Sequence, residues 1–168
     1  MIRAGIIGGA GYTAGELIRL LVNHPQVRLA FVHSTSNAGN RIADVHGGLE
    51  GDTELRFADT CDLASIDVLL LCSAHGESRK WLEAHDVPAG VKIIDLAQDF
   101  RDESDGFVYG LPELNRDRIR TAERVANPGC FATAIQLALL PLAAAGLLTG
   151  EVHVTAVTGS TGAGVKPS

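Results

Sequence analysis

A cluster of glycines directly after a short apolar run constrains the fold of this sequence more than any other feature. Residues 2–7 (IRAGII) suit a buried strand, and residues 8–15 (GGAGYTAG) lead from it into a segment with a broad apolar helical face. Small residues let such a turn approach a pyrophosphate, and the helix N-terminus offers free N–H groups. The spacing GxxGxxA predicts a dinucleotide-binding turn, with a tight turn that binds nothing as the alternative. The residues expected to contact the dinucleotide are Gly8, Gly11, Tyr12, Thr13 and Ala14.

Strand-like and helix-like segments alternate along the rest of the chain. Apolar runs predict strands over residues 2–7, 27–33, 54–57, 66–72, 91–96 and 151–158. Helical spacing predicts helices over residues 12–23, 78–85 and 131–145, with a kink or early end at Pro141. Residues 99–127 form a long polar stretch, and its core at residues 109–112 (YGLP) is expected to be an ordered loop. The alternation indicates the α/β class, with a Rossmann-type, doubly wound parallel sheet.

The last part of the sequence determines the expected domain division. A length of 168 residues favours one domain, or one domain with part of another. The strand predicted at 151–158 has no sheet of its own, and a domain rarely ends on such a strand. We therefore expect a dinucleotide-binding domain over residues 1–148 and only the start of a second, α+β domain over residues 149–168.

Composition and charge exclude several classes of protein. Hydrophobic residues make up 46% of the chain, which is incompatible with a disordered chain. A net charge of −6 argues against nucleic acid as the main partner, because phosphate binding needs clustered cations. The longest apolar stretch, residues 134–148, is interrupted by Gln136, Pro141 and Gly146, so no membrane span is expected. The three cysteines form no CxxC pair and no metal-ligand spacing is present, so we expect no metal site. The unpaired cysteines and the absence of a secretory leader predict a cytoplasmic protein.

The end of the second predicted strand bears on the choice of dinucleotide. An acidic residue there would bind the ribose hydroxyls of NAD and repel a 2′-phosphate, but residues 33–37 read HSTSN and none lies between residues 27 and 44. The hydroxyls of Ser34 and Ser36 and the cation Arg41 suit a 2′-phosphate. We therefore expect NADP(H) rather than NAD. The alternative is an ordinary polar loop with a solvated Arg41.

Cys130 lies at a predicted helix start, in the segment NPGCFATA (residues 127–134). The Pro-Gly pair before it fixes a turn, so the thiol faces the positive end of the helix dipole, which favours the nucleophilic thiolate. Cys61 and Cys72 fit better the common role of a buried structural cysteine. A dinucleotide turn combined with an activated cysteine predicts hydride transfer through a thioester, formed when the thiolate attacks an activated acyl carbon.

Taken with several other segments, the cysteine motif resembles that of the N-acetyl-γ-glutamyl-phosphate reductases, relatives of aspartate-semialdehyde dehydrogenase. The segments that carry the resemblance are GGAGYTAGEL (residues 8–17), IDLAQDFR (94–101), YGLPEL (109–114), VANPGCFATA (125–134) and STGAG (160–164). The resemblance implies reductive dephosphorylation of N-acetyl-γ-glutamyl phosphate by NADPH, a step of arginine biosynthesis, with Cys130 as the nucleophile. At residues 97–98 the sequence reads Ala-Gln where many relatives carry Ser-Ala, so the acyl group stays open between acetyl and succinyl.

Further site residues are expected at strand ends and glycine turns. Arg101 is expected to clamp the phosphate or carboxylate of the substrate, the alternative being a surface ion pair with Asp99 or Asp102. The remaining expected contacts are Asn127 and Gly129 for the substrate, and Ser73, His75, Ser160 and Gly162 for the cofactor.

The resemblance also implies an acid/base histidine in a second domain, and a homo-oligomer in the longer chain. None of the six histidines present stands in that motif, so the 168 residues alone are expected to be nearly inactive. Two alternatives stay open at this point. One is an enzyme like aspartate-semialdehyde dehydrogenase, and the other is a truncated dinucleotide-binding module without catalysis.

Overall fold

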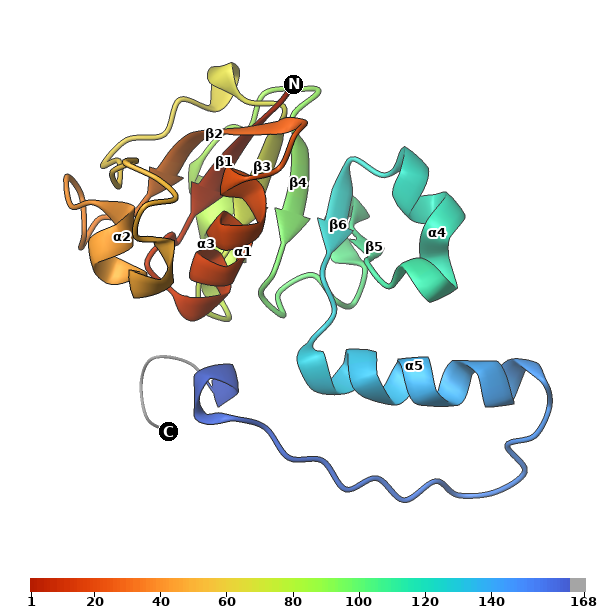
Figure 1. Cartoon of the computed structure of the whole chain (residues 1–168). Helices are drawn as coiled ribbons and strands as arrows, with labels where there is room; N and C mark the ends of the chain where they lie inside the picture. Colours follow the sequence, from red (N-terminus) through yellow and green to blue (C-terminus); the bar gives the residue numbers. More distant parts are fainter. Residues whose placement is uncertain (164–168) are drawn as a thin grey trace.

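The computed structural model describes residues 1–163 and has a six-stranded sheet at its centre (Figure 1). Residues 164–168, which include Gly164 of the predicted glycine loop, lie outside the described part. The strand order is β2-β1-β3-β4-β6-β5, and every neighbouring pair is parallel. The strands are β1 (Ile2–Ile7), β2 (Val27–His33), β3 (Val68–Leu71), β4 (Lys92–Asp95), β5 (Val108–Tyr109) and β6 (Arg124–Ala126). The expected Rossmann-type parallel sheet is confirmed.

The strand order reverses direction at β1, which pairs with β2 on one side and with β3 on the other. In open parallel sheets, ligands bind outside the carboxyl ends of the strands at such a reversal. The glycine cluster of residues 8–15 follows β1 directly and therefore lies at this point of the sheet.

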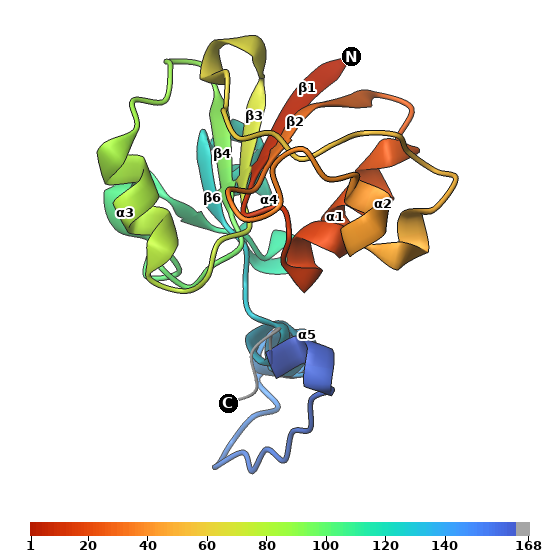
Figure 2. The same ribbon diagram turned by 90° about the vertical axis from the view of Figure 1, so that its left-hand side faces the viewer.

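Helices cover both faces of the sheet, as Figure 2 shows. α1 (Tyr12–Val22) and α2 (Ile42–Val45) lie on one face, and α3 (Glu77–Ala84) lies on the other. Successive strand residues point to opposite faces, so Ile6 packs in the apolar cluster under α1 while Ile7 packs in the cluster under α3. These two apolar layers hold the carboxyl ends of the central strands in fixed positions.

The loop expected at residues 109–112 is limited to Gly110 and Leu111, because the polar stretch 99–127 contains regular structure that the sequence does not predict. This stretch contains β5, β6, the short turn η3 (Ser104–Gly106) and α4 (Pro112–Thr121). Pro112 occupies the first turn of α4, where its fixed φ favours helix and its missing N–H is not needed. Polar residues dominate α4, and β5 has only two residues. Neither element therefore shows the apolar spacing from which helices and strands are predicted.

The strand predicted at residues 54–57 is also absent. This segment makes one isolated antiparallel bridge between Arg41 and Arg56, and the next residue, Ala58, makes one parallel bridge to His33. The remaining short helical turns are η1 (Gly47–Leu49) and η2 (Leu63–Ser65). Since a strand needs a continuous ladder, the two alternating apolar residues of this segment, Leu55 and Phe57, are insufficient evidence for one.

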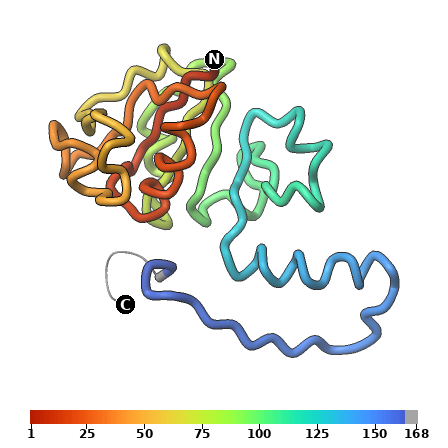
Figure 3. The backbone as a smooth tube through the Cα atoms, in the orientation of Figure 1, coloured from red at the N-terminus to blue at the C-terminus, as the bar shows by residue number. Residues whose placement is uncertain are grey.

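The chain after β6 leaves the sheet. α5 (Cys130–Ala144) extends away from it, and the following residues return beside the helix to η4 (Ser160–Ala163) (Figure 3). The helix continues past Pro141 to Ala144, so it does not end early. Residues 151–158 pair with no segment of residues 1–163 and form no strand, which contradicts the prediction. No helix among these residues is long and apolar enough to cross a membrane.

Candidate active site

The turn between β1 and α1 is shaped by Gly8. Its φ is +78°, in the left-handed region that side chains disfavour. A Cβ at this position would lie 2.8 Å from the main-chain carbon and oxygen of Cys72 and 2.9 Å from the nitrogen of Ser73. The end of β3 therefore comes so close to this turn that only glycine fits.

The N-terminus of α1 has no side-chain cap. Gly11 occupies the cap position in extended conformation and accepts the hydrogen bond from the Gly15 N–H at 3.0 Å. The N–H groups of the first turn, from Tyr12 to Ala14, have no partner within the helix. The predicted pyrophosphate site is thus a set of free donors at the positive end of a helix dipole, and this fits a dinucleotide.

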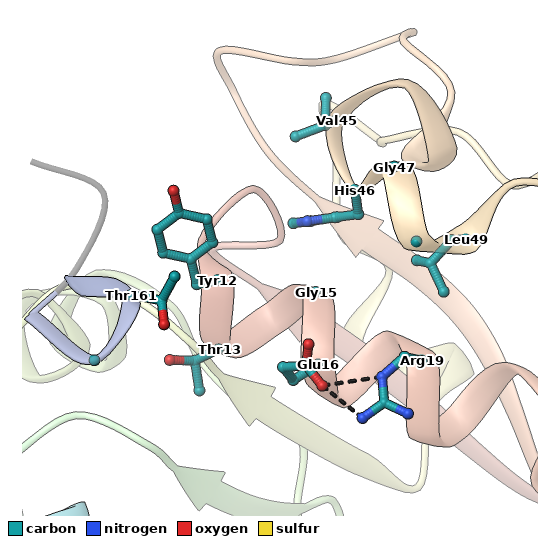
Figure 4. Close-up of a pocket in the computed structure, with 12 residues that line it drawn as sticks. Tyr12, Thr13, Gly15, Glu16, Arg19, Val45, His46, Gly47, Leu49 and Thr161 are labelled. Carbon is teal, nitrogen blue, oxygen red and sulfur yellow. Dashed lines mark hydrogen bonds and ion pairs between the residues drawn. The ribbon is translucent and has the colours of Figure 1, made fainter. Parts of the chain in front are cut away.

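A groove of about 560 Å³ starts at this turn and runs along α1 (Figure 4). Tyr12 and Thr13 line its beginning, and the wall opposite comes from the segment around His46. Thr161 and Gly162 of η4 also line it, although they lie far along the chain. The structure therefore brings the second glycine segment, predicted through Ser160 and Gly162, to the groove of the first.

The hydroxyl groups expected to face a 2′-phosphate gather after β2. The Ser34 and Ser36 Oγ atoms lie 3.5 Å apart, and the Asn37 side-chain amide donates to Ser36 Oγ at 3.0 Å. Ser34 is buried and its N–H donates to the Ala58 carbonyl at 3.1 Å. This anchoring holds the polar loop against the sheet, with the Ser34 side chain buried and the Ser36 hydroxyl and Asn37 amide nearer the surface.

Arg41 is less available than the sequence indicates. Its guanidinium pairs with Glu54 at 3.1 Å and lies 3.8 Å from Asp44. Arg56, which the sequence analysis missed, is exposed, and its guanidinium donates to the Gly39 carbonyl at 2.8 Å. It reaches the same polar loop through the bridge to Arg41, a pairing that no local pattern reveals.

The turn between β3 and α3 carries Ser73 and His75. The His75 Nδ1 atom accepts a hydrogen bond from the Gln98 N–H at 3.2 Å. The Asp99 carboxylate caps α3, because it accepts from the N–H groups of Gly76 at 2.6 Å and Ser78 at 2.9 Å. Asp99 therefore has a structural role that sequence reasoning did not assign, and it is not the ion-pair partner of Arg101.

Arg101 binds main-chain groups next to the cysteine motif. Its Nε donates to the Asn127 carbonyl at 2.9 Å, and a terminal nitrogen donates to the Leu96 carbonyl at 3.1 Å. Its other terminal nitrogen lies 2.8 Å from where a Cβ on Gly129 would stand. Within residues 1–163 no carboxylate lies at ion-pair distance from this guanidinium. The surface ion pair considered as the alternative is not formed, and the charge remains available.

Cys130 is the first residue of α5 and is exposed. Gly129 is the cap residue and no side chain caps the helix, so the thiol lies beside free N–H groups, as the sequence predicts. The other two thiols differ. Burial raises the pKa of the Cys61 thiol, and burial together with the charge of Asp95 raises that of Cys72 to about 12. Cys61 and Cys72 therefore stay protonated at neutral pH.

The end of β4 binds the cysteine turn, and the end of β5 binds the helix that follows it. The Asn127 N–H donates to the Asp95 carbonyl at 2.7 Å. Burial raises the pKa of the Asp95 carboxyl, whose Oδ1 accepts from the Ala97 N–H at 3.2 Å. The Tyr109 hydroxyl donates to Oε1 of Gln136 in α5 at 3.1 Å. This contact between sheet and helix had no signal in the sequence, because the partners are far apart along the chain.

The parallel sheet and the uncapped glycine turn define an α/β domain of the dinucleotide-binding class. The model of the semialdehyde dehydrogenase NAD binding domain matches residues 3–122, and that of the semialdehyde dehydrogenase dimerisation domain matches residues 130–168. The chain belongs to the semialdehyde dehydrogenase family.

Relatives named N-acetyl-gamma-glutamyl-phosphate reductase match the whole chain. The one from Bacteroides thetaiotaomicron is 65% identical over 169 residues, covering 99% of this chain and 52% of the relative. The one from Azobacteroides pseudotrichonymphae is 62% identical over 170 residues, covering 100% of this chain and 54% of the relative. The chain spans about half the length of these relatives. The resemblance drawn from the sequence motifs is confirmed.

Solved structures of aspartate semialdehyde dehydrogenases share the fold. Enzyme II of Vibrio cholerae, in complex with ASA, superposes with a TM-score of 0.65 at 23% identity, over 86% of this chain and 47% of that one. The Candida albicans enzyme with NADP gives a TM-score of 0.66 at 16% identity, over 88% of this chain and 48% of that one. At these identities the likeness concerns the fold alone.

Proposed function

We propose that this chain supplies the cofactor-binding domain and the nucleophile of an NADPH-dependent N-acetyl-γ-glutamyl-phosphate reductase, which forms N-acetylglutamate semialdehyde in arginine biosynthesis. The position of Cys130 carries the proposal. This thiol is exposed at the start of α5, directly after a turn that Arg101 binds. It follows β6 at the same edge of the sheet that holds the glycine turn. A nucleophile, a cation and a dinucleotide turn on one edge suit reduction of an acyl phosphate.

The proposed reaction uses the side chains in sequence. The Cys130 thiolate attacks the acyl carbon, the bond from that carbon to the phosphate oxygen breaks, and inorganic phosphate leaves as the thioester forms. Arg101 stabilises the departing phosphate, and Asn127 and Gly129 contact the substrate beside the sulfur. NADPH, when bound, supplies the hydride that reduces the thioester. Breaking of the carbon–sulfur bond then releases the semialdehyde and restores the thiolate, and the proton taken up ends on the phosphate.

NADP(H) is assigned to the groove that begins at the glycine turn. The close fit at Gly8 and the uncapped N-terminus of α1 support a bound pyrophosphate. The paired hydroxyls of Ser34 and Ser36 support a 2′-phosphate, with Arg41 and the neighbouring Arg56 as cations. The remaining cofactor contacts proposed are those of Gly11, Tyr12, Thr13, Ala14, Ser73, His75, Ser160 and Gly162.

We also propose the setting in which this domain works. The dinucleotide-binding domain covers residues 1–148 and a second domain starts at residue 149, in a cytoplasmic homo-oligomer. The match of a dimerisation-domain model to residues 130–168 supports oligomer formation. The second domain would contribute the acid/base histidine, so we expect these 168 residues alone to show almost no turnover.

Acylation in a single turnover tests the proposal on the chain as it is. Without NADPH, N-acetyl-γ-glutamyl phosphate should acylate Cys130 once and release one equivalent of phosphate, as seen by mass spectrometry. The Cys130→Ser variant should not react, whereas Cys61→Ser should react as the original chain does. Preferential acylation by aspartyl phosphate would support an aspartate-semialdehyde dehydrogenase instead. NADPH binding without any acylation would support a non-catalytic module.

A further inference from the structure

His46 reaches the glycine turn from a distant part of the chain. It stands between α2 and η1, and its Nε2 lies 2.8 Å from the Gly9 carbonyl oxygen, 37 residues away in sequence. A carbonyl oxygen accepts hydrogen bonds and cannot donate them, so Nε2 carries the proton. The imidazole therefore donates to the main chain of the proposed pyrophosphate-binding turn.

This hydrogen bond fixes the orientation of one peptide group in the turn. The Gly9 N–H is itself bound to the His33 carbonyl at 2.9 Å, so the residue is held on both sides. In a trans peptide the C=O and the following N–H point in opposite directions, so the Ala10 N–H faces away from His46. Rotation of this peptide by half a turn would place the carbonyl oxygen where an N–H group was. In a pyrophosphate site that exchange replaces attraction by repulsion.

The His46 ring packs closely against α1 and Phe57. A Cβ on Gly15 would lie 2.5 Å from Nδ1 and 2.9 Å from Cε1 of His46, so the ring packs on the bare backbone of α1. The Phe57 ring lies on another side, with centroids 6.1 Å apart. Figure 4 shows the His46 side chain beside Gly15, at the wall of the groove near Tyr12. The absence of a side chain at Gly15 is therefore explained by the packing of the His46 ring rather than by contact with a ligand.

We propose that His46 is a positioning residue, which holds the Gly9–Ala10 peptide in the orientation that binds the pyrophosphate of the cofactor. The inference rests on the proposed binding of NADP(H). It predicts that His46 contributes to the affinity for ligands that contain the pyrophosphate. His46 should not contribute to the affinity for the 2′-phosphate end of the cofactor, which binds after β2.

Two ligands and a matched pair of variants test this inference. NADPH contains the pyrophosphate, whereas adenosine 2′-monophosphate lacks it. The His46→Leu variant should raise the Kd of NADPH roughly tenfold, because one main-chain hydrogen bond is lost, and should leave that of adenosine 2′-monophosphate within about twofold. The His46→Gln variant keeps an N–H donor near the same position and should restore most of the NADPH affinity. His85→Leu is the control, since His85 Nδ1 also binds a carbonyl, that of Trp81, at 2.8 Å, and it should change neither Kd.

The outcomes that would overturn the inference are distinct from failure of the proposed function. Unchanged NADPH affinity in His46→Leu, or equal weakening of both ligands, would contradict the positioning role. If His46→Leu does not fold, Gly15→Ala takes its place, because the added methyl displaces the ring while the histidine remains, and the same tenfold loss for NADPH is expected. If the original chain binds neither ligand, the assignment of NADP(H) itself is wrong, and this inference falls with it.

Discussion

The guanidinium of Arg101 lies against Gly129, one residue before the cysteine at the start of α5. The contact is so close that a Cβ on Gly129 would stand 2.8 Å from a terminal nitrogen of the arginine. Together with the hydrogen bond from Nε to the Asn127 carbonyl, it fixes a positive charge beside the turn that presents Cys130. The charge and the sulfur are therefore positioned by the same short segment of backbone.

Gly129→Ala should separate the role of this charge from that of the thiol. The added methyl pushes the guanidinium away, so acylation of Cys130 by N-acetyl-γ-glutamyl phosphate should slow by roughly tenfold or more. Alkylation by uncharged iodoacetamide should change little. The control is Gly150→Ala, because a Cβ there meets nothing within 4 Å. Equal slowing of both reactions would show that Arg101 does not act on the phosphate.

Gly8→Ala should destabilise the whole domain. The residue has φ of +78° and a Cβ would meet the main chain of Cys72, so we expect a loss of at least about 1 kcal/mol in the free energy of unfolding. Gly48→Ala is the matched control, since a Cβ at Gly48 meets nothing within 4 Å. Urea unfolding followed by circular dichroism measures both. Equal stability of the two variants would contradict the close approach of β3 to the turn.

The ion pair between Arg3 and Asp67 should make the stability of the fold depend on pH. Hydrogen bonds from the side chain and N–H of Arg3 lower the pKa of Asp67 from 3.8 to about 2. The stabilisation is therefore complete above pH 3.8 and is lost as the pH falls through about 2. Asp67→Asn should unfold at lower urea concentration at pH 7 and lose less stability between pH 4 and pH 2. Unchanged acid sensitivity, with exposed Asp59→Asn as control, would contradict this role.

The hydrogen bond from Tyr109 to Gln136 should hold the cysteine helix against the sheet. Tyr109→Phe removes the hydroxyl alone, and we expect a cost of about 1 kcal/mol with faster hydrogen exchange in α5. Hydrogen exchange in β1 and β3 should stay slow, because those strands are buried in the core of the sheet. Tyr12→Phe is the control, as half of the Tyr12 side chain is exposed. If α5 exchanges at the original rate in both variants, the hydroxyl does not fasten the helix.

The elements that were predicted from the sequence are those whose residues are buried in regular order. β1, β2 and α1 have apolar patterns because they form the core around Ile6 and Ile18, and the glycines between them leave a clear signal. α4 is polar, so its apolar spacing is weak and the sequence does not predict a helix there. Residues 151–158 have the pattern of a strand, but pairing depends on a neighbour, and none is present within residues 1–163.

The candidate site was predicted where chemistry is local and missed where it is not. The place of Cys130 at a helix start follows from the neighbouring Pro-Gly pair. The cap that Asp99 forms on α3 and the hydrogen bond from His46 to Gly9 join residues 21 and 37 positions apart. Such pairs depend on how the helices lie on the sheet. The sequence pattern of a single segment does not contain that information.

Alkylation of the three thiols at pH 7 tests most directly whether Cys130 is an activated nucleophile. Each thiol is compared with itself in the urea-unfolded chain, with sites of iodoacetamide modification read by mass spectrometry. Cys130 should react roughly tenfold faster in the folded chain than in the unfolded one, because its exposed sulfur lies beside the free N–H groups at the uncapped start of α5. Cys61 and Cys72 should react more slowly when folded, since burial raises their pKa values. A folded Cys130 that reacts no faster than the unfolded one would contradict the account.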